Sequence, residues 1–229
     1  MSILLHIETS TTNCSVGISR NGEVVALKQQ NDANYSHAEN LHLFIIEVLK
    51  EAGYTPGELE AIAVSKGPGS YTGLRIGVST VKGMCFALDK PLVAIDTLEI
   101  LARQYVVEDS SNDFIVPLID ARRMEVYSAV FDFNYNKLRQ TEAEIINPES
   151  FKDYLKEAKV HFIGDGAAKC KGVITHPNAV FTEEILYPSA NEMATIATKK
   201  YKAGDFENLA YFEPFYLKDF IGVKSRKQS

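Results

Sequence analysis

A glycine-rich segment joins an apolar strand to a long apolar-periodic helix in the first half of the chain. Residues 66–77 read Lys-Gly-Pro-Gly-Ser-Tyr-Thr-Gly-Leu-Arg-Ile-Gly. The preceding run Ala61–Val64 predicts a buried strand, and the segment from Leu74 to Leu88 predicts a helix. A loop between such elements turns backbone N–H groups toward the space in front of the helix, where an anion is favoured.

The loop matches neither common nucleotide-binding fingerprint. A P-loop needs a Gly-Lys pair before Ser or Thr, and no such pair follows here. A dinucleotide-binding loop needs G-x-G-x-x-G, and Thr72 stands at the third glycine position. The segment therefore has the form of a phosphate-binding turn without either standard sequence.

The overall composition limits the classes of protein to consider. A chain of 229 residues with 45% hydrophobic residues can form one large or two small domains with a real core. The net charge of −6 argues against broad, non-specific nucleic-acid binding. Three scattered cysteines, Cys14, Cys85 and Cys170, predict free thiols in a reducing cytoplasm. No apolar run approaches the ~20 residues that a membrane helix needs.

The same order of elements is predicted twice. Three strands come first in each half, followed by a helix, a strand and a glycine turn. In the first half the strands are Ile3–Glu8, Cys14–Ser19, Glu23–Gln29, Ala61–Ser65 and Leu92–Ile95, with helices Ser36–Ala52, Thr72–Leu88 and one from Asp96 to about Val107. In the second half the strands are Phe114–Ile119, Glu125–Phe133, Glu142–Ile146 and Val160–Ile163, with helices starting at Asn147-Pro148 and running from Ser189 to about Ala203.

This repetition predicts an α/β protein of two similar halves, residues 1–107 and 108–229. The polar stretch over residues 108–113 is the predicted linker. A single continuous sheet shared by both halves would contradict this prediction.

The two long helices of the first half are candidates for an interface. Leu74, Val78 and Val81 follow one apolar seam, and Gly73 and Gly77 beside it would let another helix approach closely. The helix Ser36–Ala52 is apolar over more than half of its circumference, so it needs a second cover beyond one sheet. That cover is either the rest of this chain or a partner. The partner-binding candidates are Leu41, Phe44, Ile45, Val48, Gly73, Leu74, Gly77, Val78 and Val81.

Catalytic and metal-binding patterns are missing from the sequence. The five histidines form neither H-x-x-x-H nor H-E-x-x-H, and His37 and His42 point about 140° apart on a helix. No G-x-S-x-G nucleophile elbow occurs. Arg122 and Arg123 predict either a phosphate or carboxylate contact or a salt-bridged turn. We therefore predict no catalytic residue and no metal site.

Several motifs together resemble the TsaB (YeaZ) family. The strongest is Gly67-Pro68-Gly69-Ser70-Tyr71-Thr72-Gly73-Leu74-Arg75. Further matches are Ile7-Glu8-Thr9-Ser10, where the family more often has Asp at position 8, and Ser36-His37-Ala38-Glu39. The second half contributes Asp120-Ala121-Arg122-Arg123-Met124-Glu125-Val126-Tyr127, Gly164-Asp165-Gly166-Ala167 and Pro214-Phe215-Tyr216-Leu217-Lys218, with Lys218 where Arg is commoner.

The resemblance implies an actin/hexokinase-like (ASKHA) ATPase fold and a non-catalytic role without a cofactor. It implies that the chain activates a TsaD-type enzyme, which makes N6-threonylcarbamoyladenosine at position 37 of tRNAs reading codons that begin with A. A TsaE-type ATPase would join the larger complex, and a homodimer would form in the absence of the partner. The family associates through its first-half helices, which favours the partner as the second cover. Contact with tRNA would come only through the complex.

Two alternatives remain at this point. A stand-alone ATPase or kinase of the same fold would grip phosphates at Thr9 and Ser10 in the first hairpin and at Gly164 and Gly166 in the second half, with Glu8, Asp120 and Asp165 as candidate carboxylates. The turn after Ser10 lacks the glycine that lets backbone approach a phosphate, so we interpret these loops as vestigial. A metalloprotease relative would need a bound metal.

Overall fold

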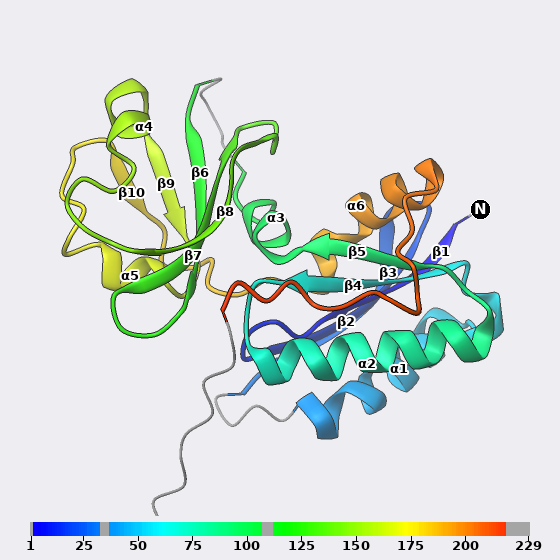
Figure 1. Ribbon diagram of the computed structural model, residues 1–229. Coiled ribbons are helices and arrows are strands. Elements are labelled where there is room, and N and C mark those ends of the chain that lie inside the picture. The colour runs from blue at the N-terminus through cyan, green and yellow to red at the C-terminus, as the bar shows by residue number, and fades with distance from the viewer. Residues whose placement is uncertain (1, 33–36, 107–111, 219–229) are drawn as a thin grey trace, which may run out of the picture.

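The computed structural model describes residues 2–32, 37–106 and 112–218, and their strands form two five-stranded sheets (Figure 1). The first sheet has the order β3-β2-β1-β4-β5, with β1 Ile3–Glu8, β2 Asn13–Arg20, β3 Glu23–Asn31, β4 Ala61–Gly67 and β5 Leu92–Asp96. The second has the order β10-β9-β6-β7-β8, with β6 Phe114–Asp120, β7 Glu125–Asp132, β8 Lys137–Ile145, β9 Val160–Ile163 and β10 Ala179–Phe181.

The two sheets have the same connectivity. In each, the first three strands pair antiparallel, and the fourth strand pairs parallel to the first. The fifth strand then pairs parallel to the fourth. Two separate sheets with one repeated order confirm the predicted α/β fold of two similar halves.

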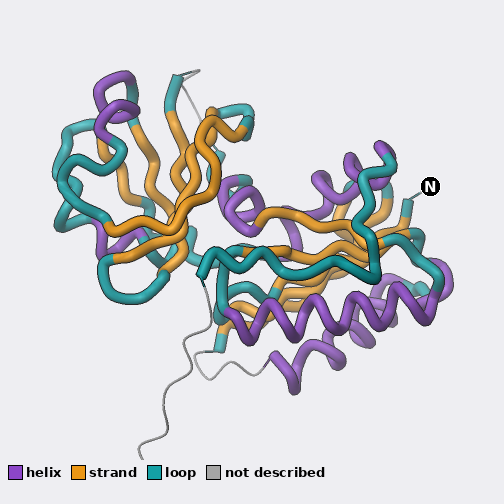
Figure 2. The backbone as a smooth tube through the Cα atoms, viewed as in Figure 1, coloured by secondary structure: helices purple, strands orange, loops and turns teal. Residues whose placement is uncertain are grey.

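The helices differ between the halves (Figure 2). Two long helices, α1 His37–Ala52 and α2 Tyr71–Leu88, run side by side across one face of the first sheet. The opposite face is covered by α6 Ala190–Ala203. Among the described residues, the helices that pack with the second sheet are the short α4 Lys152–Glu157 and α5 Ala167–Cys170. A short 3₁₀ turn, Pro56–Glu58, precedes β4.

Alternating side chains of β1 pack against the helices on both faces of the first sheet. Leu5 and Ile7 pack into the cluster under α1 and α2, whereas Leu4 packs into the cluster under α6. All three are fully buried. Because successive side chains of a strand point to opposite faces, an unbroken apolar strand predicts a sheet covered on both sides.

Helix α3, Thr97–Ala102, lies between the two sheets (Figure 1). Its residues Leu98 and Leu101 pack against Ile115, Ile119 and other apolar side chains of the second sheet. Asp96 caps this helix by accepting the Leu98 N–H at 2.9 Å. This shared cluster joins the halves through apolar contact rather than through the chain connection alone.

The structure changes several predicted boundaries. Helix α6 packs on the first sheet, although the division at residues 107 and 108 assigns it to the second half. Its polar cap at Ser189 carries no information about which sheet it will cover. Helix α3 ends at Ala102, short of Val107, and Phe151 at φ 60° delays the start of α4 beyond Asn147-Pro148. Strand β8 begins earlier than predicted, and β10 was not predicted. Ser36 and most of the predicted linker lie outside the described residues.

After α6, residues 205–218 cross the front of the first half toward the second; we call this segment the strap (Figure 1). The N–H of Glu207 donates to the Leu92 carbonyl at 2.9 Å, and that of Phe215 donates to the Lys66 carbonyl at 2.7 Å. Lys82 of α2 donates to the Phe212 carbonyl at 2.9 Å. The strap is therefore attached along its length to the sheet and to α2.

Candidate functional site

The glycine loop packs directly on the first hairpin turn. The Ser70 N–H donates to the Ser10 carbonyl at 2.6 Å, and the Thr9 hydroxyl donates to the Gly73 carbonyl at 2.9 Å. A Cβ atom at Gly69 would lie 2.3 Å from the Ser10 carbonyl oxygen, and one at Gly73 would lie 2.1 Å from the Thr9 carbonyl oxygen. Both distances are far below van der Waals contact, so glycine is required for this close approach.

The same contact explains Gly77, whose Cβ would lie 2.3 Å from the Thr9 hydroxyl oxygen. We expected Gly73 and Gly77 to admit a helix from another chain. The structure corrects this interpretation, because both glycines admit the hairpin turn of their own chain.

Glu8 is fully buried beneath this turn. Its Oε1 accepts the Ser10 N–H at 2.6 Å and the Ser10 hydroxyl at 2.5 Å. Burial raises the pKa of the Glu8 carboxyl to about 7, although the hydrogen bonds from Ser10 act in the opposite direction. The N–H that a phosphate would need at Ser10 is thus already taken by a carboxyl group.

The second-half turn is also closed by its own hydrogen bonds. The Gly164 N–H donates to the Ile185 carbonyl at 2.7 Å, and the Gly166 N–H donates to the Leu118 carbonyl at 3.0 Å. Gly164 has φ +99°, and a Cβ there would lie 2.2 Å from the Leu118 carbonyl oxygen. These glycines serve the close packing of the turn on β6.

The predicted phosphate loops use three of their N–H groups within the protein. The N–H groups of Ser10, Gly164 and Gly166 have acceptors within the protein, and none of the three is offered to a ligand.

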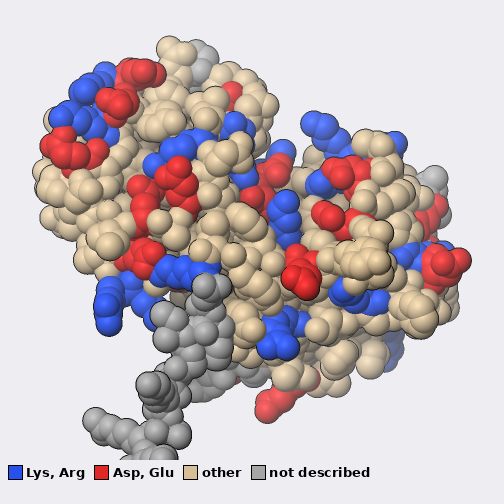
Figure 3. All heavy atoms as spheres, in the orientation of Figure 1, with Lys and Arg blue, Asp and Glu red and all other residues tan. Residues whose placement is uncertain are grey.

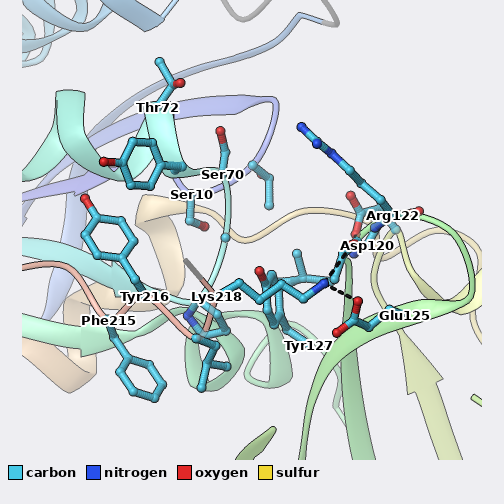
Figure 4. A pocket seen from close by; sticks show the side chains of 18 of the residues that line it. Ser10, Ser70, Thr72, Asp120, Arg122, Glu125, Tyr127, Phe215, Tyr216 and Lys218 are labelled. Carbon is cyan, nitrogen blue, oxygen red and sulfur yellow. Dashed lines mark hydrogen bonds and ion pairs between the residues drawn. The ribbon is translucent and has the colours of Figure 1, made fainter. Parts of the chain in front are cut away.

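A cleft of about 1030 Å³ nevertheless opens between the halves (Figure 4). Residues from the first hairpin and the start of α2 form one wall, and the β6–β7 turn forms the other. The strap supplies the remaining side. The polar and aromatic lining residues include Ser10, Ser70, Tyr71, Thr72, Asp120, Arg122, Arg123, Glu125, Tyr127, Asp165, Tyr216 and Lys218.

Two carboxylates face each other at the second-half wall. The Asp120 N–H donates to Asp165 Oδ1 at 2.9 Å, and Lys169 pairs with Asp120 at 3.0 Å. Burial, followed by the nearby charge of Asp120, raises the pKa of Asp165 to about 6. Asp120 and Asp165, two of the three candidate carboxylates from the sequence, both line the cleft. The third candidate, Glu8, is buried under the opposite turn and does not line it.

The β6–β7 turn presents two arginines in a strained backbone conformation. Arg122 has φ 74° and Arg123 has φ 52°, in the left-handed region that side chains other than glycine rarely adopt. The Arg122 N–H donates to Asp120 Oδ1 at 2.6 Å, which holds the turn. Both arginine side chains are exposed, and neither forms an ion pair with a carboxylate in the part of the chain that the structure describes.

The strap closes the cleft by reaching the second half. Lys218 forms an ion pair with Glu125 of β7 and donates to the Ala121 carbonyl at 3.4 Å (Figure 4). Tyr216 packs against Tyr71 at the start of α2, with ring centroids 4.9 Å apart. The motif of residues 214–218 was the one signal for this role in the sequence analysis. The sequence could not show that the motif meets α2 and β7.

Most of the predicted partner-binding side chains lie in the core. Leu41, Ile45, Val48, Leu74, Val78 and Val81 are between 0% and 6% exposed. All of these except Leu74 pack in the cluster between α1, α2 and the first sheet, and Phe44 is partly buried against it. The predicted seam faces the sheet because it is the more continuous apolar stripe. The outer faces of the two helices expose other apolar side chains: Leu43 (56%), Ile46 (63%) and Phe86 (83%).

Histidines and cysteines have structural surroundings. His37 bonds the Thr11 carbonyl at 2.7 Å, and His161 lies between Tyr105 and Asp113 at 2.7 and 2.9 Å. Burial lowers the pKa of His6 to about 3. The three cysteines are buried and unpaired. Among residues 2–32, 37–106 and 112–218, no three His, Cys, Asp or Glu side chains come together as metal ligands. Within those ranges, no helix is long and apolar enough to cross a membrane.

Comparison with known proteins identifies relatives over nearly the full length. A family profile described as "TsaD: tRNA N6-adenosine threonylcarbamoyltransferase" matches residues 28–221. The tRNA threonylcarbamoyladenosine biosynthesis protein TsaB of Escherichia coli is 26% identical and covers 96% of each chain. TsaB of Buchnera aphidicola from Schizaphis graminum is 30% identical over 83% of this chain and 90% of its own.

A solved structure agrees with these sequences. YeaZ from Pseudomonas aeruginosa superposes with a TM-score of 0.81 at 28% identity, and the match covers 95% of this chain and 100% of that one. The similarity therefore extends over both halves, the cleft and the strap.

Proposed function

We propose that this chain, which belongs to the TsaB (YeaZ) family and matches the TsaD family profile, is the non-catalytic subunit of a tRNA-modifying complex. It would bind and activate a TsaD-type enzyme, which transfers a threonylcarbamoyl group to N6 of adenosine 37 in tRNAs reading codons that begin with A. The full-length similarity to proteins named for threonylcarbamoyladenosine biosynthesis carries this proposal. The complex would act in the cytoplasm.

The outer face of α1 and α2 supports a protein partner. Leu43, Ile46 and Phe86 are large apolar side chains that this chain leaves more than half exposed. Burying each in an interface would contribute about 1–2 kcal/mol, because only the exposed part of a side chain worth about 1.5–3 kcal/mol remains to be buried. We propose that the catalytic subunit covers this face, that a second copy of the chain covers it when that subunit is absent, and that a TsaE-type ATPase joins the assembled complex.

The closed phosphate turns support the assignment of the chemistry to the partner. The N–H groups of Ser10, Gly164 and Gly166 already have acceptors, and the acceptor of the Ser10 N–H is the buried Glu8 carboxyl group. This arrangement disfavours the alternative of a stand-alone ATPase or kinase. The metalloprotease alternative requires a set of metal ligands, and the described residues bring none together.

Reconstitution tests the proposal. The purified chain should co-elute with a TsaD-type enzyme and switch on threonylcarbamoyl transfer to tRNA. Ile46→Asp should weaken both effects, with binding about 30-fold weaker, whereas Ile145→Asp should preserve them. Ile145 is a matched control, because it is 70% exposed on β8 of the other half. A chain that neither binds the enzyme nor changes its activity would contradict the proposed function.

A further inference from the structure

Two hollows of the surface meet at a pair of tyrosines. The cleft between the halves and a smaller groove of about 300 Å³ between α2 and the strap share Tyr71 and Tyr216 in their linings. The two rings lie with centroids 4.9 Å apart and planes inclined by 37°. The Arg75 guanidinium lies 5.4 Å from the Tyr71 ring centroid, and its Nη1 donates to the Tyr71 hydroxyl at 3.2 Å. We call the continuous surface formed by both hollows the tyrosine groove.

Cations without carboxylate partners line the tyrosine groove. Arg75, Lys82, Arg122 and Arg123 form no ion pair among the residues that the structure describes, and Lys82 bonds only backbone carbonyls of the strap. Two lining carboxylates, Asp120 and Glu125, are each neutralised by a lysine. Asp165 and Glu213 remain, so unpaired cations outnumber unpaired carboxylates four to two.

This local balance contrasts with the rest of the chain. The protein carries a net charge of −6, and Figure 3 shows acidic and basic side chains interspersed over both halves of the visible face. A broad electrostatic attraction for polyanions is therefore missing. Any anionic ligand of the tyrosine groove must be held by the few unpaired cations at that place.

We propose that the tyrosine groove binds a single-stranded segment of the tRNA substrate, an inference that rests on the proposed function for the identity of the ligand. Aromatic rings that stack on bases, combined with arginines that contact phosphates, are the features that recognise unpaired RNA. Tyr216 is 37% exposed and supplies a stacking face. Arg75 in the smaller hollow and Arg122 in the cleft would contact the backbone of a strand that crosses the groove. Figure 4 shows Tyr216 and Arg122 among the side chains that line the cleft.

RNA fits this surface better than a protein segment does. The apolar side chains suited to a protein interface, Leu43, Ile46 and Phe86, lie on the outer faces of α1 and α2 and do not line either hollow. The groove instead offers rings and unpaired guanidinium groups. The chain would thus bind enzyme through one surface and RNA through another.

Fluorescence anisotropy with the assembled complex tests the RNA contact. The probe is the labelled anticodon arm of a tRNA that reads codons beginning with A. Tyr216→Leu should weaken binding about tenfold, because a stacked base is lost. Tyr216→Phe, which keeps the ring, should bind as the wild type does. Equal melting temperatures of these two variants would show that the strap remains in place.

A charge series tests the phosphate contact independently. Arg75→Gln should weaken binding and reduce the slope of log affinity against log salt by about one unit. Lys156→Gln removes a positive charge from α4, where the side chain is exposed and far from the groove in the fold, and should leave both quantities unchanged. Unchanged RNA affinity in both Tyr216→Leu and Arg75→Gln would overturn the proposal.

Kinetics separates this proposal from the proposed function. With saturating tRNA, Tyr216→Leu should stimulate the enzyme fully, with the loss confined to a higher KM for tRNA. If Tyr216→Leu and Arg75→Gln instead lose the enzyme in a pull-down, the tyrosine groove is a protein-docking surface and the RNA proposal is wrong, while the proposed function stands. If the wild-type chain fails to stimulate the enzyme at all, the proposed function itself is wrong.

Discussion

Two adjacent isoleucines of α1 should respond in opposite ways to the same substitution. Ile45 is 6% exposed in the core beneath α1, and Ile46 is 63% exposed on its outer face. From the sequence, Ile45→Asp or Val78→Glu is expected to weaken association, and to leave the fold intact only if those side chains face outward. The structure places both side chains in the core, so unfolding is expected instead.

The cost of Ile45→Asp is close to the whole stability of a domain. Losing the buried side chain costs about 1.5–3 kcal/mol, and placing a carboxylate there without a partner costs several kcal/mol more. Folded domains are stable by only about 5–15 kcal/mol. We therefore expect Ile45→Asp to be unfolded or to melt far below the wild type.

Ile46→Asp should fold and lose its partner. Only 37% of the Ile46 side chain is covered in the isolated chain, so the substitution removes about 0.5–1 kcal/mol of stability. In an interface the same change leaves a carboxylate against apolar groups, and a loss of about 2 kcal/mol corresponds to about 30-fold weaker binding. Thermal melting and a binding titration with the TsaD-type enzyme measure the two effects.

The conservative variant Ile45→Val provides the control for the core position and should cost about 0.5–1.5 kcal/mol. A normal melting temperature for Ile45→Asp would refute the assignment of helix faces. Unchanged enzyme binding by a folded Ile46→Asp would refute the outer face of α1 as the interface.

Three further predictions follow from single positions. Gly73→Ala should destabilise the protein by about 1–3 kcal/mol, because the new Cβ atom would meet the Thr9 carbonyl oxygen. Gly83→Ala should stabilise α2 by about 1 kcal/mol, because a Cβ atom there has no neighbour within 4 Å. Chemical denaturation measures the free energy of unfolding of both variants. Burial raises the pKa of Glu8 from 4.5 to about 7. Because the folded protein holds this proton more tightly than the unfolded chain does, the stabilisation is complete below pH 4.5 and is lost as the pH rises through about 7. Relative to Glu8→Gln, the free energy of unfolding of the wild type should fall by about 3 kcal/mol between these pH values. A flat difference between the two proteins would contradict the buried, raised pKa. Metal analysis of the untagged protein should find no stoichiometric zinc or iron, and a stoichiometric metal lost on mutating His37 or His42 would show this prediction to be wrong.

The sheets could be predicted from the sequence because their signals are local. Asn21-Gly22 fixes the β2–β3 hairpin, and both residues adopt positive φ, as that turn requires. The apolar run Ala61–Val64 predicted a buried strand, and these residues are buried in β4. The repeated order of strands and helices then predicted two α/β units.

The faces of α1 and the position of α6 could not be predicted in the same way. Helix α1 carries apolar side chains at both Ile45 and Ile46, so periodicity alone does not say which stripe meets the sheet. Helix α6 follows the second sheet in sequence but packs on the first, a choice made by long-range contacts. The cleft also depends on distant segments, since Ser10, Asp165 and Tyr216 come from three parts of the chain.

The duplicated halves have acquired different surfaces through the lengths of their helices. Helices α1 and α2 have 16 and 18 residues, whereas α4 and α5, at the corresponding places in the second half, have 6 and 4. A helix of four to six residues makes little more than one turn, so it covers part of a sheet and leaves no long outer ridge. Within the part of the chain that the structure describes, the extended helical face therefore belongs to the first half. The second half contributes the β6–β7 turn and its two arginines to the opposite wall of the cleft. The same order of strands thus carries the proposed docking face in one half and places positive charge beside the cleft in the other.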